Sequence, residues 1–343
     1  MVWKYSFKLS VRLCVKESVT DRKIYVWDAC LSIAILLVKS LVEAPVEDKR
    51  ITLREAVKLV PDGAHVFWGG FGFQRPPMAF AHELVRQNKR GLTLYTCGSE
   101  MDMDILCGAK VVSRLELAFF AIEGIGLVPN IQRRIREGAI EIEDYSNLAM
   151  ALRFMGGALG VPFMPLKSML GTDVLAKKRF RSKKAEVMDC PFSGEKVVLV
   201  PSVRPDFSIV HASRVDMEGN VQIDGIKGED VEGARAGKNV IVLAEEIVDT
   251  EFIRSQPDQT VIPNIYVTHV VECPWGSFPM MVYNYYDYDM QHIRMYYDQC
   301  KTEDGWQKYL NEYIMEPKDH TKFLTKIGIE HLMKFRAKKP FAY

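Results

Sequence analysis

Apolar residues recur at helical and at strand spacing in alternation along the chain, beginning near residue 51. Leu53, Val57 and Val60 lie on one face of a predicted helix. Thr52 is placed to cap that helix, with Glu55 as its capping-box partner. Further helices are predicted at 78–87 and 104–112, and strands within 61–68 and at 92–97, 115–122, 196–201, 207–215, 221–223, 239–244 and 266–271. This βαβ alternation predicts an α/β fold, an open and mostly parallel sheet with helices on both faces.

The pattern also divides the chain into an N-terminal extension and one domain. No long linker and no internal repeat interrupts the alternation, so a single domain is expected over residues 48–343. The apolar stretch at 29–38 is too short to span a bilayer. Asp28 before it and Glu43 after it fit a signal peptide poorly. We therefore interpret residues 1–47 as an N-terminal extension of unknown role, either an extra helix or a stray upstream extension, rather than an export signal.

Composition and charge exclude several classes of partner. The chain has 343 residues, of which 48% are hydrophobic, and its 45 Lys and Arg balance 44 Asp and Glu. Such a chain has no global field to attract nucleic acid or an anionic membrane, so phosphate recognition must be local. Its seven cysteines form no CxxC pair, which argues against structural zinc and favours a reducing cytoplasm.

The segment VFWGGFGFQRPP, residues 66–77, is the first candidate for chemistry. Gly69, Gly70 and Gly72 separate a predicted strand from a helix whose start is marked by two prolines, so backbone amides can approach a ligand closely. Helix N-termini favour anions, and Arg75 adds a planar donor suited to a carboxylate or phosphate. The spacing matches neither the dinucleotide fingerprint nor a P-loop. A ligand cradle and a plain tight turn both stay open from this loop alone.

Together with its neighbours, the segment resembles the first signature of family I coenzyme A transferases. Trp68 replaces a smaller aliphatic residue of that signature, and Arg75 replaces a glycine, as in glutaconate-type α subunits. The resemblance covers residues 51–328. It continues through IEGIGLVPNIQRRIREGAIEIEDYS, GALGVPFMPLKSMLGTD, VHASRVDMEGNVQ and VVECPWGSFPMMVYNYYDYD.

The resemblance implies that the nucleophile lies on another chain. In this family a glutamate of the β half, in a Ser-Glu-Asn-Gly motif, forms an acyl anhydride and then a glutamyl-CoA thioester. The nearest string here is GSEMDMD, in which Met101 and Asp102 follow Ser99 and Glu100. The chain is therefore similar to an α subunit that joins a β subunit in a hetero-oligomer and moves coenzyme A between carboxylic acids. The CoA thioester is then a substrate, and no permanently bound cofactor is implied.

The resemblance also implies a set of binding residues. The loop amides would stabilise an oxyanion, and Arg75 would orient a carboxylate substrate. The candidates are Gly69, Gly70, Phe71, Gly72, Gln74, Arg75 and Ser99.

Two carboxylates are the catalytic candidates. Glu100 follows the carboxyl end of a predicted strand, where α/β folds place ligands. A solvated loop carboxylate beside Asp102 and Asp104 is nevertheless the favoured interpretation. Glu123 ends the apolar strand that begins at Leu115, so we expect it to emerge from a buried strand. An acid–base role and a structural role, in a helix cap or an ion pair, both stay open for Glu123.

Two other functions remain alternatives. One is a subunit of an acyl-CoA hydrolase or ring-opening enzyme of steroid-type catabolism, in which Glu123 activates water. The other is a non-catalytic partner subunit.

Three further segments carry no catalytic assignment. We expect the basic run at 177–184 to be a solvated loop and 216–220 to be a hairpin turn. The tyrosine-rich segment at 283–299 suits either a subunit contact or core packing.

Overall fold

The computed structural model describes residues 47–177 and 183–337. The apolar stretch at 29–38 and the middle of the basic run, 178–182, lie outside the described residues. The division of the chain at residue 48 stays a prediction. No helix in the described ranges has both the length and the apolar character that a membrane crossing requires.

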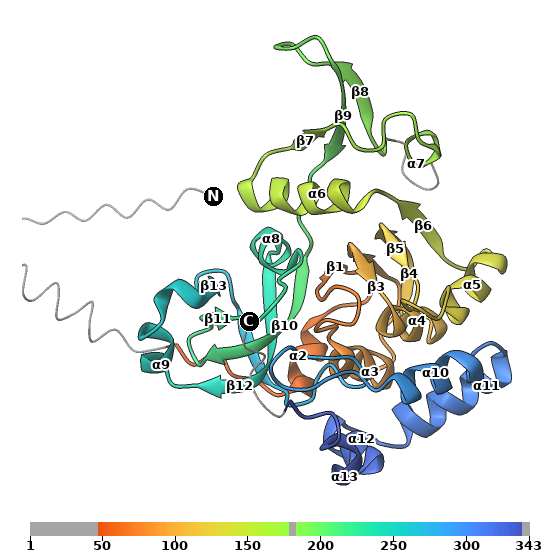
Figure 1. Cartoon of the computed structure of the whole chain (residues 1–343), viewed down its shortest axis with the longest axis vertical. Coiled ribbons are helices and arrows are strands. Elements are labelled where there is room, and N and C mark those ends of the chain that lie inside the picture. Colours follow the sequence, from red (N-terminus) through yellow and green to blue (C-terminus); the bar gives the residue numbers. More distant parts are fainter. Residues whose placement is uncertain (1–46, 178–182, 338–343) are drawn as a thin grey trace, which may run out of the picture. The chain divides into compact units, whose positions relative to one another are not determined.

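A mixed sheet of nine strands forms the centre of the described fold (Figure 1). Its strands are β1 (His65–Trp68), β2 (Leu92–Tyr95), β4 (Val112–Leu117), β6 (Glu141–Asp144), β10 (Phe207–Asp216), β11 (Val221–Gln222), β12 (Asn239–Val248), β13 (Thr260–Ile262) and β14 (His269–Glu272). Seven strands pair in parallel in the order β14, β12, β10, β1, β2, β4 and β6. Strand β11 pairs antiparallel with both β10 and β13. The predicted mostly parallel sheet is confirmed.

Strand β10 organises the sheet because it has three neighbours. Strand β12 runs along the whole of one edge. On the other edge β1 pairs only as far as Ile209, and β11 pairs only at Arg214 and Val215. The edge is therefore open between Ile209 and Arg214, just beyond the carboxyl end of β1.

Helices cover both faces of the sheet. They are α2 (Leu53–Leu59), α3 (Met78–Arg86), α4 (Met101–Gly108), α5 (Pro129–Arg136), α6 (Asn147–Leu159), α7 (Asp173–Ala176), α8 (Asp230–Ala236), α9 (Thr250–Arg254), α10 (Met290–Gln299), α11 (Glu303–Tyr309), α12 (His320–Ile327) and α13 (Ile329–Leu332). A 3₁₀ turn, η1 (Pro257–Gln259), precedes β13, and a π-helical turn, η2 (Leu310–Met315), follows α11.

Alternate residues of β1 show how the two helical layers divide. Val66 and Trp68 pack with the apolar faces of α2, α3 and α4. Phe67 points to the other face, where its ring meets Phe154 of α6 edge-on at a centroid distance of 4.8 Å. This strand is buried on both faces, as expected for a parallel sheet between helices.

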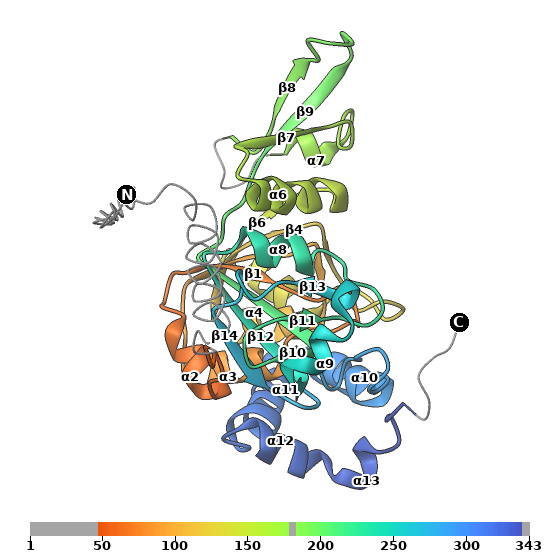
Figure 2. The same ribbon diagram turned by 90° about the vertical axis from the view of Figure 1, so that its left-hand side faces the viewer.

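A smaller antiparallel sheet extends from the main sheet beyond α6 (Figure 2). It consists of β7 (Phe163–Leu166), β8 (Glu186–Asp189) and β9 (Lys196–Pro201), the last with the bounds that the sequence predicts. A pair of two-residue strands, β3 (Gly98–Ser99) and β5 (Phe119–Phe120), lies apart from both.

Several predicted boundaries are wrong, among them the ends of β2 and β12 and the start of β14. The helix expected at 104–112 is α4, which begins at Met101 and ends at Gly108. The strand expected at 115–122 is β4 and the separate β5, with Ala118 between them. The predicted hairpin turn is present, because β10 and β11 are antiparallel and Asp216 accepts hydrogen bonds from Asn220.

The start of α2 has the predicted capping box. The Thr52 hydroxyl accepts a hydrogen bond from the Glu55 amide at 3.2 Å, and the Glu55 carboxylate accepts one from the Thr52 amide at 2.9 Å. Two helix-terminal donors are thereby satisfied on an exposed turn.

We expect Thr52→Ala to lower the free energy of unfolding by about 1 kcal/mol, because the N3 amide loses its acceptor. Thr52→Ser keeps the hydroxyl and serves as the control, with a loss of less than half of that value. Urea unfolding followed by circular dichroism measures both. Equal stability of the Ala and Ser variants would contradict a stabilising role for the cap.

Candidate active site

Three loops meet at the carboxyl edge of the parallel strands. They follow β1, β2 and β4, which are neighbours in the sheet. Ligands of α/β proteins bind at this edge, because there the loops rather than the strands present side chains. The loops contain the glycine turn at 69–75, Glu100 and Glu123.

The tip of the glycine turn is Gly72 with Phe73. Phe71 and Gln74 close the turn with two backbone hydrogen bonds of 2.9 and 3.0 Å. Gly72 has φ +57°, which a residue with a Cβ adopts only with strain. The amides of Gly72 and Phe73 donate no hydrogen bond to any residue that the structure describes. The tip therefore presents two free donors.

Gly69 and Gly70 have a different role from the one predicted. The Gly69 amide donates to the carbonyl of Ile209 at 2.9 Å, and the Gly70 amide donates to Asp230 Oδ1 at 2.8 Å. A Cβ on Gly69 would lie 2.7 Å from Asp230 Oδ1, and one on Gly70 would lie 2.8 Å from the Arg75 carbonyl oxygen. These glycines allow close packing of the loop, and their amides are unavailable to an oxyanion.

Arg75 is buried rather than presented to a substrate carboxylate. Its Nη2 lies 3.0 Å from Asp230 Oδ2, and both side chains are almost fully covered. Burial raises the pKa of Asp230, and the Arg75 charge and the Gly70 amide oppose that rise. The expectation that Arg75 orients a substrate is thus corrected, since its charge is matched within the chain.

The start of α3 is not an anion site either. Two of its first amides already have acceptors, because Met78 donates to the Pro76 carbonyl and Ala79 donates to the Gly276 carbonyl, each at 2.8 Å. Gln74 lies at the side of the turn, where its amide nitrogen approaches the Met281 sulfur at 3.3 Å.

Glu100 lies beside the turn and is fully buried. A Cβ placed on Gly72 would lie 3.6 Å from Glu100 Oε1. Neither oxygen of the carboxyl group has a hydrogen-bond partner in the described part of the chain. Burial, together with the nearby Asp102 and Glu123 carboxylates, raises the pKa of Glu100 to about 8. The Glu123 amide opposes this rise without reaching hydrogen-bond geometry. At neutral pH the group is mainly a neutral acid, and the predicted solvated loop carboxylate is wrong.

Glu123 occupies the opposite environment. It is exposed, and a Cβ on Gly72 would lie 3.9 Å from its Oε1. It lies in the tight turn between Ile122 and Gly126, beyond β5, so it does not emerge from a buried strand as expected. The three loops thus bring Glu100 and Glu123 to the same glycine.

The remaining candidates surround this point. Ser99 belongs to β3, where its backbone pairs with Phe120, and its side chain lies outside the described part of the structure. Phe71 packs against two backbones: a Cβ on Gly228 would lie 3.3 Å from Phe71 Cβ, and one on Gly98 would lie 3.8 Å from its ring.

Sequence reasoning missed the residues that support the site. Asp230 stands 155 positions from Arg75 and has no local signal. Asp102 accepts a 2.6 Å hydrogen bond from the Trp68 indole, which accounts for the unusual tryptophan in the signature. Asp104 accepts from the Tyr296 hydroxyl at 2.7 Å. Trp68 was the available clue, because a buried indole needs an acceptor.

The structure also tests the predictions for the basic run and the tyrosine-rich segment. Lys184, at the end of the basic run, is buried, with its ammonium group 3.1 Å from a Glu143 carboxylate oxygen, so it is not part of a solvated loop. In the tyrosine-rich segment, Tyr286 and Tyr296 are buried and support the core-packing alternative.

The comparison with known protein families shows to which family the chain belongs. Residues 50–273 match the family described as Coenzyme A transferase. The chain belongs to the coenzyme A transferase family.

Its relatives include the corresponding subunits of named transferases. This family member is 33% identical to the A subunit of glutaconate CoA-transferase from Acidaminococcus fermentans, over 86% of this chain and 97% of that one. The crystal structure of the glutaconate enzyme superimposes with a TM-score of 0.80, covering 84% of this chain and 96% of that one. The A subunit of 3-oxoadipate CoA-transferase from Pseudomonas knackmussii is 34% identical over 81% of this chain and 98% of that one. These matches make the chain an α-type transferase subunit.

Two further relatives are not named as transferase subunits. An uncharacterised protein of Archaeoglobus fulgidus is 39% identical over 82% of this chain, and the match spans 62% of that protein. A cholesterol ring-cleaving hydrolase IpdA subunit of Rhodococcus jostii is 28% identical over 79% of this transferase chain and 94% of the hydrolase subunit.

The burial of Glu100 makes the stability of this transferase subunit depend on pH. From about pH 4.5 to about pH 8 the folded protein keeps the Glu100 proton while the unfolded chain releases it. Ionisation therefore favours unfolding, and this contribution to stability falls as pH rises through that window. Glu100→Gln removes the titration, so we expect the variant to gain stability relative to wild type between pH 5 and pH 8.

Urea unfolding of both proteins across this range measures the difference. The other titrating groups are common to the two proteins, and the contributions of those distant from Glu100 cancel in the difference. A difference that stays constant with pH would contradict the assignment of Glu100 as a buried neutral acid.

Proposed function

We propose that this subunit transfers coenzyme A between carboxylic acids, at least one of them dicarboxylic, with a β subunit that supplies a glutamate nucleophile. The observation that carries the proposal is the glycine turn, whose tip has two free amides, those of Gly72 and Phe73, and whose Gly72 lies beside the buried acid Glu100. The relatives' names support the substrate class, because glutaconate and 3-oxoadipate are both dicarboxylates. The chain itself contains no Ser-Glu-Asn-Gly motif.

The proposed reaction has two exchange steps. The partner's glutamate attacks the acyl-CoA carbonyl carbon and the carbon–sulfur bond breaks. The CoA thiolate departs, and an acyl-glutamyl anhydride is formed. The thiolate then attacks the glutamyl carbonyl carbon, which releases the acyl group as a free carboxylate and forms a glutamyl-CoA thioester. An acceptor carboxylate reverses both steps, so that the acceptor leaves as its CoA thioester and the glutamate is restored.

This chain would contribute stabilisation of charge. Each attack places a negative charge on a carbonyl oxygen, and the Gly72 and Phe73 amides are donors that can meet it. Glu100 keeps its proton near neutral pH, so it would add no further negative charge beside the carboxylate and the thiolate that exchange in each step.

Hydrolysis remains the second candidate, supported by the similarity to a ring-cleaving hydrolase subunit. Glu123 is exposed beside the glycine turn, where a water molecule could reach it. Under the transfer mechanism Glu123→Gln should leave the exchange rate within a few-fold of wild type. If Glu123 activates water, the same variant should lose hydrolysis by about 100-fold. A non-catalytic partner subunit would show neither activity.

Covalent trapping tests the transfer mechanism directly. The chain, purified in complex with its β subunit, is incubated with glutaconyl-CoA and treated with borohydride, which reduces a thioester to an alcohol. We expect mass spectrometry to find one reduced glutamate on the partner chain. Release of free coenzyme A without any reduced glutamate would contradict transfer and favour hydrolysis.

Gly72→Ala tests the turn. The substitution places a methyl group between the two carboxylates and strains a residue with φ +57°, so the free amides move. We expect about a 100-fold loss of kcat, the scale of a 1 Å misplacement. Gly138→Ala is the matched control, because Gly138 has φ +65° and no atom within 4 Å of the new methyl group. Equal activity of the two variants would remove the turn from the site.

A further inference from the structure

The outward face of helix α6 is apolar along its whole length. Four residues form this face, Leu148, Leu152, Met155 and Leu159, and we call them the α6 seam. They are four, three and four positions apart, so they lie within about 60° of one another around the helix axis. Leu148 is 52% exposed and Leu159 is 67% exposed. The seam contains no charged residue, and Arg153, which is the charged residue of α6, is buried.

The opposite side of α6 is packed against the domain. The ring of Phe154 meets Phe67 of β1 edge-on, and a Cβ on Gly157 would collide with the Val203 carbonyl oxygen. A helix at a protein surface normally has polar residues on the side away from the core, and a helix that is apolar on all sides is normally covered all round. The seam therefore needs a cover that the described residues do not provide.

The spacing of the seam indicates what kind of cover it fits. Alternating steps of four and three are the pattern with which the side chains of one helix insert between those of another. The seam spans three turns, about 17 Å. Its surface is convex and so unlike a small-molecule site. Helices that bind membrane surfaces carry Lys or Arg on their polar face, whereas α6 has no Lys and its Arg is buried. An apolar helix of a partner protein fits best.

The seam begins at the edge of the sheet where the proposed site lies. Helix α6 starts just after β6, whose carboxyl end pairs with that of β4. There the Asn147 carbonyl accepts a hydrogen bond from the Cys97 thiol at 3.8 Å. Cys97 stands three residues before Glu100, and Leu148 is the residue after Asn147. The seam is therefore continuous with the loop that carries Glu100.

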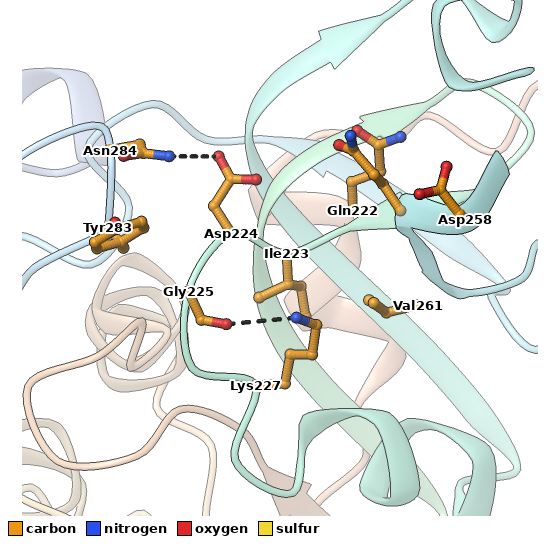
Figure 3. Close-up of a pocket in the computed structure, with 10 residues that line it drawn as sticks. Gln222, Ile223, Asp224, Gly225, Lys227, Asp258, Val261, Tyr283 and Asn284 are labelled. Atoms are coloured by element: carbon orange, nitrogen blue, oxygen red, sulfur yellow. Dashed lines mark hydrogen bonds between the residues drawn. The ribbon is translucent and has the colours of Figure 1, made fainter. Parts of the chain in front are cut away.

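The pocket beside the glycine turn suits an apolar helix poorly. It has a volume of about 360 Å³ and lies between the loop after β11 and the segment that follows β14 (Figure 3). Asn284 donates to Asp224 there, and Lys227 and Asp258 also line the pocket. An apolar helix would remove these charged groups from water at a cost in free energy. The α6 seam has no such groups, so docking is favoured at the seam.

We propose that the α6 seam binds an apolar helix of the β subunit and thereby holds that subunit at the carboxyl edge of the sheet. The proposed site is incomplete without the glutamate of the β subunit, which must reach the loops that contain Gly72 and Glu100. A partner helix on the seam lies beside those loops at one end. The inference rests on the proposed function, because it assumes a β subunit that completes the site.

A double variant of the full chain, Met155→Glu with Leu159→Lys, tests the proposal. Both side chains are exposed, so the packed side of α6 is left intact. The new residues form an i,i+4 pair that favours the helix, and the net charge of the chain does not change. The matched control is Met155→Leu with Leu159→Met, which keeps the seam apolar. Biolayer interferometry gives the Kd for the β subunit, and coenzyme A exchange is measured as the β subunit is titrated.

We expect the charged double variant to bind the β subunit at least 100-fold more weakly, because two charges replace two apolar side chains in the contact. The apolar control should stay within threefold of wild type. At saturating β subunit, kcat of the charged variant should return to within twofold of wild type, since the seam does not touch the substrate. The milder single variant Leu159→Lys, at the last residue of α6, should weaken binding about tenfold.

Several results would overturn the proposal. Unchanged affinity for the β subunit in both charged variants would remove the seam from the contact. Loss of a homodimer with unchanged affinity for the β subunit would assign the seam to a second copy of this chain. A lower free energy of unfolding with unchanged affinity would assign it to a contact within the chain. A rate that saturating β subunit does not restore would place the effect in the site itself.

The proposal and the proposed function fail in different ways. If the wild-type complex forms the glutamyl adduct and the charged variants bind the β subunit as tightly as wild type, the seam alone is wrong. If the charged variants weaken the complex but the wild-type complex forms no adduct, the proposed reaction is wrong and the seam is kept.

Discussion

The site depends on one buried carboxylate, that of Asp230. Its two oxygens hold the Gly70 amide at 2.8 Å and the Arg75 guanidinium at 3.0 Å, so that one side chain fixes both ends of the glycine turn. Removing one partner of such a buried pair leaves an uncompensated charge, at a cost of about 3–5 kcal/mol. Because Asp230 opens α8, the same contact ties the turn after β1 to a helix on the opposite face from α3.

Asp230 also helps to determine which backbone amides of the glycine turn remain available to a ligand. It accepts from Gly70, the Ile209 carbonyl accepts from Gly69, and Phe71 pairs with Gln74, so the unpaired donors lie at the tip of the turn. Of the glycines, Gly69 and Gly70 are needed for close packing, and Gly72 is needed for its positive φ. A turn held this firmly can keep its donors in place while a substrate changes, which is the arrangement that stabilises a developing charge.

Local patterns predicted the elements well and the site only in part. The capping box of Thr52 and the bounds of β9 follow from neighbouring residues, and both are confirmed. The run from Leu115 to Ile122 contains no glycine or proline, and every residue after Glu116 is apolar, so nothing in it reveals the bend at Ala118. The environment of Glu100 depends on distant segments, because Trp68, Tyr296 and the loop after β4 cover the acidic cluster. Three acidic residues within five positions indicate solvent-exposed side chains only when no such partners cover them.

The long strand β10 explains how the loop after β11 reaches the glycine turn. It extends beyond β1 by several residues, and β11 folds back onto the extension through the turn at 216–220. The loop that leaves β11 must then pass the carboxyl end of β1 to reach α8, and there it contacts Phe71 before Asp230 binds the turn. The loop that follows β11 and the anchor of the glycine turn are therefore one continuous segment, residues 222–230.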